Sequence, residues 1–82
     1  MEIRNLTTFV RIAEIRNFSK VAEELGYSQS AVTMQIKQLE EELNVRVFER
    51  IGKRVKLTAA GERLLPYALE IQESVNKAEH IS

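Results

Sequence analysis

The sequence contains no cysteine, so it can form neither disulfides nor thiolate metal sites. It has only three glycines and one proline in 82 residues, which favours helices joined by short connections. No apolar run approaches the roughly 20 residues of a membrane-spanning helix, and the first residues lack the layout of a signal peptide. Together these absences favour one small globular domain in a reducing, cytoplasmic setting.

An excess of charge of one sign is also missing, because 12 Lys and Arg residues balance 12 Asp and Glu residues. A net charge of zero argues against a nucleic-acid-binding protein, which usually carries a basic excess. The charges are, however, unevenly distributed. Residues 46–56 contain five cations and one acid, and residues 25–39 contain no acid at all. The neutral total therefore conceals a basic patch.

Two helices are predicted at the start of the chain. Apolar residues from Ile3 to Ala13 recur on one helix face. This helix should end near Arg16 and Asn17, because asparagine tolerates the left-handed conformation that closes helices. Ser19 is predicted to cap a short second helix, which Gly26 should terminate.

A third helix is predicted over residues 29–43, with Ser28 as its N-cap and Asn44 as its stop. A tight turn containing glycine precedes it, and the pair therefore has the pattern of a helix-turn-helix. Its buried stripe comprises Val32, Ile36, Leu39 and Leu43, and its opposite face comprises Ser30, Thr33, Met34 and Lys37.

Two short alternating segments, residues 47–50 and 54–57, flank Ile51-Gly52-Lys53 and predict a β-hairpin. Val55 and Leu57 should face inwards while Arg54 and Lys56 face outwards, which makes the hairpin a basic wing. We therefore predict an all-α fold with a small β-hairpin wing, that is, a winged helix-turn-helix over residues 1–58.

The last segment, residues 59–82, is predicted to be a long linker helix capped by Thr58. Its apolar steps are close to the 3.5-residue period of paired helices, and Pro66 should bend the helix or displace its start. The part of the chain before residue 59 is too small to cover the whole helix. A second copy of the chain should therefore pair with this helix to form a homodimer. The positions predicted for this dimer seam are Leu64, Leu65, Ala68, Ile71 and Val75.

The polar face of the third helix is a candidate DNA-reading surface, since a major groove admits one helix. Gln29 can bond an adenine edge in two places, whereas Ser30 and Thr33 can bond several bases. Cations on a narrow hairpin can hold phosphates or enter a minor groove. The predicted DNA-binding set comprises Ser28, Gln29, Ser30, Thr33, Met34, Lys37, Arg50, Lys53 and Arg54.

Each feature also has an ordinary structural explanation. The polar helix face could be merely solvated, the wing charges could only protect a hairpin edge, and the last helix could pack on its own domain. A protein-interaction module is therefore the alternative function. The basic wing beside a polar helix face favours DNA binding, because an interaction module has no use for those cations.

Catalytic chemistry finds no support in the residue pattern. His80 is the only histidine and has no ligand companion at a useful spacing. Glu40, Glu41 and Glu42 are consecutive helix positions that face different directions, so they are predicted to be a solvated face. We predict no catalytic residue, no metal site and no cofactor.

Several segments, taken in order, resemble the N-terminal DNA-binding domain of LysR-type transcriptional regulators. The resemblance runs from about Leu6 to Leu65 and is strongest in Leu43–Arg50 and Leu57–Glu62. It implies a dimeric regulator that binds an imperfect inverted repeat, forms tetramers in many full-length members, and responds to an inducer held by a separate C-terminal domain. This sequence should then be a fragment that lacks the effector domain and binds DNA but no ligand.

Two positions depart from the usual pattern of that family. Ser30 stands where many members have proline, so a hydroxyl replaces an apolar thymine contact. Met34 stands where arginine is frequent, so this chain lacks a guanine or phosphate contact there. The base-reading roles implied by the resemblance fall on Gln29, Ser30 and Thr33, the backbone contact on Lys37, and the wing on Arg50, Lys53 and Arg54.

Overall fold

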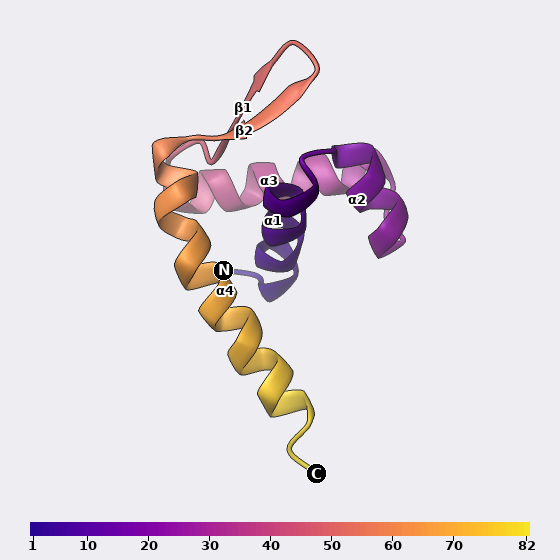
Figure 1. Cartoon of the computed structure of the whole chain (residues 1–82), viewed down its shortest axis with the longest axis vertical. Helices are drawn as coiled ribbons and strands as arrows, with labels where there is room; N and C mark the ends of the chain where they lie inside the picture. Colours follow the sequence, from indigo (N-terminus) through magenta and orange to yellow (C-terminus); the bar gives the residue numbers. More distant parts are fainter.

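The computed structural model describes residues 1–82 and contains four helices and one two-stranded antiparallel sheet (Figure 1). The first three helices and the hairpin form one body, and the last helix extends from it as a long arm (Figure 1). This architecture confirms the predicted all-α fold with a β-hairpin wing. In chain order the elements are α1 (Ile3–Ile15), α2 (Phe18–Leu25), α3 (Gln29–Leu43), β1 (Phe48–Ile51), β2 (Arg54–Leu57) and α4 (Ala59–Glu79).

The core lies where the first three helices meet the base of the hairpin. Phe9 on α1 is completely buried, and its ring centroid lies 5.3 Å from that of Phe48 on β1. Phe18, the first residue of α2, meets Phe48 edge-on with centroids 6.0 Å apart. These aromatic contacts fix the wing relative to both helices. The other large buried apolar residues are Leu6, Val10, Ile12, Val21, Val32, Ile36, Leu39, Val47 and Val55.

Two polar contacts attach α3 to α1. Asn5 and Thr8 on α1 are fully buried. The Thr8 hydroxyl donates to Gln35 Oε1 at 2.5 Å, and Asn5 Nδ2 donates to Gln38 Oε1 at 3.0 Å. Buried polar groups require specific partners, so these bonds set the rotation of α3 about its axis and thereby the face that it exposes.

Most helix ends lie where the sequence predicts them. The Ser28 hydroxyl accepts from Ala31 N, and the Thr58 hydroxyl accepts from Gly61 N, so these two residues cap α3 and α4. Gly26 and Asn44 close α2 and α3 in the left-handed conformation, with φ of 76° and 55°. These predictions are confirmed. The sequence is sufficient for them because each role depends only on local backbone chemistry.

The junction between α1 and α2 differs from the prediction. Asn17, not Ser19, caps α2, because its side chain accepts a hydrogen bond from Lys20 N at 3.0 Å. Its extended backbone (φ −148°) suits an N-cap, so the left-handed residue that ends α1 is Arg16 (φ 59°). The Ser19 hydroxyl is therefore available for a contact outside its own helix.

The wing is a β-hairpin closed by a two-residue turn of Gly52 and Lys53, with Ile51 paired to Arg54. Gly52 has a φ of 63°, which glycine adopts without steric cost. Along β2 the side chains alternate as predicted, since Val55 is buried and Arg54 and Lys56 are exposed.

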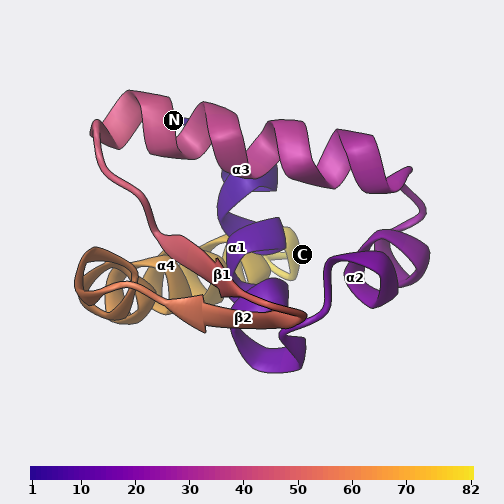
Figure 2. The same ribbon diagram turned by 90° about the horizontal axis from the view of Figure 1, so that it is seen from above.

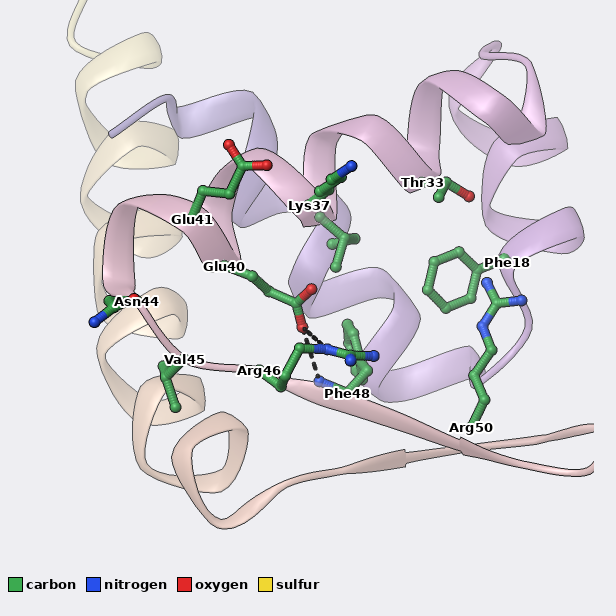
Figure 3. Close-up of a pocket in the computed structure, with 11 residues that line it drawn as sticks. Phe18, Thr33, Lys37, Glu40, Glu41, Asn44, Val45, Arg46, Phe48 and Arg50 are labelled. Carbon is green, nitrogen blue, oxygen red and sulfur yellow. Dashed lines mark hydrogen bonds and ion pairs between the residues drawn. The ribbon is translucent and has the colours of Figure 1, made fainter.

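Glu40 on α3 anchors the start of the wing (Figure 3). Its carboxylate accepts from Val47 N at 2.8 Å. It also lies 3.4 Å from Arg46 Nε, as a dashed line in Figure 3 shows. Only 15% of the Glu40 side chain is exposed. The prediction of a solvated acidic face is therefore wrong for Glu40, although Glu41 and Glu42 are exposed.

A second ion pair joins α1 to α2. Arg11 binds Glu24 in a bidentate manner, with Nε–Oε2 and Nη2–Oε1 distances of 2.8 and 2.7 Å. This hydrogen bonding raises the pKa of Arg11 and lowers the pKa of Glu24. The charges of Arg11 and Glu24 are therefore paired with each other, between α1 and α2.

The long helix α4 begins at Ala59 and continues unbroken through Pro66 to Glu79, so the proline does not displace its start. Its first turns pack on the body, where Leu64 and Leu65 are partly buried against the core. Ala68 is fully buried within the chain, and we assign it to the core rather than to a seam between chains. Farther along, Ile71 remains 37% exposed.

None of the helices combines the length and apolar character needed to cross a membrane.

Candidate nucleic-acid interface

The outward face of α3 presents all the residues predicted for base reading. Every predicted side chain on this face is exposed, and Met34 is 62% exposed. The opposite face is buried by Val32, Ile36 and Leu39, which explains why the polar positions point away from the body. The exposed set consists of Ser28, Gln29, Ser30, Thr33, Met34 and Lys37.

The wing lies beside α3, and both elements are seen together from above (Figure 2). Between them runs a groove with a volume of about 660 Å³. Thr33 and Lys37 line its α3 side, and Arg46 and Arg50 line its wing side (Figure 3). The groove is therefore bordered by cations from two elements that the sequence separates.

Arg50 is held in a defined position by Phe18. Its guanidinium carbon lies 4.1 Å from the centre of the Phe18 ring, a distance typical of a cation–π contact. The ring is itself fixed by the core, because Phe18 is only 7% exposed. The Arg50 charge thus lies at the junction of the wing and α2, next to the groove.

A smaller hollow of about 180 Å³ lies between the wing tip and the first residues of α2 and α3. Its lining includes Ser19 and Gln29 together with four cations and no acid. The hollow is therefore more uniformly basic than the groove, which Glu40 and Glu41 also line. Its cations are Arg16, Arg50, Lys53 and Arg54.

The structure therefore brings the predicted wing residues next to the first predicted base-reading residue, Gln29. Sequence reasoning missed Arg16 and Ser19 as members of this surface. Arg16 ends the first helix and precedes the wing by more than thirty residues, and no sequence signal connects the two. The predicted seam residues Ile71 and Val75 lie elsewhere, on the arm formed by α4.

No group of three or more His, Cys, Asp or Glu side chains is placed to hold a metal ion. Among the acids that line the groove, Glu40 is already engaged by the backbone of Val47 and by Arg46. The arrangement can attract anions and present hydrogen-bonding groups.

Comparison with known proteins agrees with this geometry. Residues 3–62 match the family described as bacterial regulatory helix-turn-helix protein, lysR family. A relative in Bacillus subtilis (strain 168), the uncharacterized HTH-type transcriptional regulator YwqM, is 51% identical over 71 residues, which are 87% of this chain and 24% of the relative. The chain spans about a quarter of the length of the curated relatives that it matches.

Two solved structures of DNA complexes share the fold. The DNA-binding domain of BenM with the catB site 1 DNA is 34% identical, with a TM-score of 0.92, over 99% of this chain and 91% of that chain. The DNA complex of the CbnR DNA-binding domain is 36% identical, with a TM-score of 0.90, over 98% of this chain and 92% of that chain. The chain therefore belongs to the LysR family of bacterial regulatory helix-turn-helix proteins.

Proposed function

We propose that this chain binds double-stranded DNA in a sequence-specific manner and thereby regulates transcription. The observation that carries the proposal is the position of the exposed polar face of α3 beside a basic wing, with a groove between them. The relatives are transcriptional regulators, and the similar BenM and CbnR domains have been solved with DNA. A regulator of this kind has no enzymatic role and acts in the cytoplasm, where bacterial DNA lies.

In the proposed complex α3 enters the major groove. Gln29, Ser30 and Thr33 then face base edges, to which their amide and hydroxyl groups can donate or accept hydrogen bonds. Lys37 lies one turn farther along, at a position suited to a phosphate. Met34 offers an apolar surface for thymine methyl groups.

The groove beside α3 suits the sugar-phosphate backbone that separates a major groove from the next minor groove. A strand lying there would meet Lys37 on one side and Arg46 and Arg50 on the other. The wing tip, with Lys53 and Arg54, would then reach the minor groove or its phosphates. Backbone contacts of this kind position the protein, and the contacts of α3 provide the specificity.

Replacing Arg54 by alanine should weaken binding to every duplex and flatten its salt dependence. Removing one phosphate contact should reduce the slope of log K against log salt by about 0.9. The slopes would be measured by fluorescence anisotropy between low and physiological salt. Lys77→Ala, which removes a cation from the far part of α4, is the matched control and should keep the slope. An unchanged slope for Arg54→Ala would show that this residue does not contact a phosphate.

We also propose that the chain forms a homodimer through α4, with residues 1–58 as the DNA-binding unit and α4 as the linker. The part of α4 beyond Ala68 supports this, because its large apolar residues Leu69 and Ile71 are 47% and 37% exposed. Two copies would present two α3 helices to an inverted repeat. A module used only for protein assembly would need this arm but not the basic wing.

Replacing Ile71 by glutamate should shift the dimer towards monomer, because a buried unpaired carboxylate opposes association. Sedimentation velocity over a concentration series would measure the shift. The control is Ser74→Glu, which adds the same charge at an exposed position of α4. If Ile71→Glu sediments as an intact dimer, the seam lies elsewhere.

A further inference from the structure

We propose that Ser19 is a positioning residue that orients the carboxamide of Gln29 and thereby sets the base preference at one operator position. The inference rests on the proposed DNA-reading function and deepens it. It concerns a serine on the first helix of the helix-turn-helix, outside the helix that reads the bases.

The observation is a hydrogen bond between the first turns of α2 and α3. Ser19 Oγ donates to Gln29 Oε1 at 3.0 Å, across ten residues of sequence. Because Asn17 caps α2, the Ser19 hydroxyl is not used by its own helix and makes no other side-chain hydrogen bond. Gln29 likewise has no other side-chain partner, so Ser19 alone holds its carboxamide.

The charges around this pair select which end of the carboxamide points inwards. Both residues line the small hollow that contains four cations and no acid. An amide dipole orients in the local field, so the oxygen of Gln29 turns towards the cations and the serine. The amide nitrogen Nε2 makes no hydrogen bond within the chain and is free to donate to DNA.

This orientation gives Gln29 a defined reading capacity. A glutamine oxygen has two acceptor sites and its nitrogen has two donors. With one acceptor site taken by Ser19, Nε2 can donate to the N7 of a purine and the remaining acceptor site can receive the N6 hydrogen of adenine. Without Ser19 the carboxamide would rotate freely and would accept other bases more readily.

Replacing Ser19 by alanine should therefore reduce discrimination without reducing general affinity. At the base pair that Gln29→Ala relaxes, the ratio of affinities for the preferred and substituted duplexes should fall about 3- to 10-fold, the equivalent of one hydrogen bond. Affinity for scrambled DNA, the salt slope and the melting temperature should stay unchanged. Ser19→Thr, which keeps the hydroxyl, should retain the ratio, as should the control Ser74→Ala.

The double variant Ser19→Ala/Gln29→Ala gives the sharper test. If Ser19 acts through Gln29, the double variant should discriminate no worse than Gln29→Ala alone. Independent, additive losses would overturn the inference, and so would an equal loss on all duplexes, which would indicate a phosphate contact. An unchanged ratio in Ser19→Ala, with the wild type discriminating normally, would overturn the inference and leave the proposed function intact. A wild type without any discrimination would overturn both.

Discussion

Replacing Gly61 by alanine should lower the free energy of unfolding by about 2–3 kcal/mol, the cost of overpacking a well-packed site. Gly61 lies in the first turn of α4, where it is buried against the base of the wing. A Cβ atom at this position would overlap the carbonyl oxygen of Val47 and lie 2.9 Å from Leu57 Cδ2.

The Val47 carbonyl cannot move aside without breaking other contacts. Its oxygen accepts from Thr58 N at 3.0 Å, and the amide of the same residue is held by Glu40. The added methyl group would therefore separate α4 from the wing rather than displace a flexible side chain. This close approach explains why a glycine occupies a helical position that would otherwise favour alanine.

Urea unfolding of Gly61→Ala measures this cost. The matched control is Gly26→Ala, where a Cβ would meet nothing within 4 Å but the backbone has a φ of +76°. That variant should lose less, about 1–2 kcal/mol, the cost of a left-handed alanine. A Gly61→Ala variant as stable as the wild type would show that α4 does not closely approach the backbone of Val47.

The second large effect is expected on DNA binding. Replacing Gln29 by alanine should weaken binding to the preferred duplex by about 1–3 kcal/mol and relax the preference at one base pair. The reason is that Gln29 is exposed at the first turn of α3, where its carboxamide is oriented by Ser19. Affinity for scrambled duplexes should remain nearly unchanged, because those complexes depend on phosphate contacts.

Anisotropy titrations against duplexes substituted at each base pair in turn would locate the relaxed position. A loss confined to one position in each half-site would assign that base pair to Gln29. Equal losses of affinity for preferred and scrambled DNA would instead show that Gln29 does not read a base.

The features of the fold that depend on local chemistry were predictable from the sequence. Ser28 and Thr58 cap their helices, and Gly26 and Asn44 close them, because each role requires only the residue and its immediate neighbours. The polar face of α3 was predictable for a similar reason, since a buried stripe at helical spacing leaves the other face exposed.

Features that depend on contacts between distant residues were not predictable in this way. Asn17 and Ser19 are both good capping residues, and only the position of the α1–α2 junction decides between them. Arg16 reaches the basic hollow because the wing folds back towards the end of α1. Glu40 looks like its neighbours Glu41 and Glu42 in sequence, but it alone meets the backbone of the wing.

The predicted dimer seam illustrates a related difficulty. An apolar period along α4 does not say which protein surface each residue meets. Ala68 follows the same period as Ile71, yet it is fully buried in its own chain while Ile71 is 37% exposed. What differs is how far the body of the protein extends along α4, because it covers Ala68 and leaves Ile71 partly exposed.

Sequence reading by α3, with the wing bound to the DNA backbone, is tested most directly by fluorescence anisotropy. The chain would be titrated on a pool of inverted-repeat duplexes and on scrambled duplexes, over a series of salt concentrations. We predict tighter binding to some repeats than to any scrambled duplex, with affinity that falls steeply as salt rises. Absent binding, or equal binding to every duplex at low salt, would contradict sequence reading by this chain.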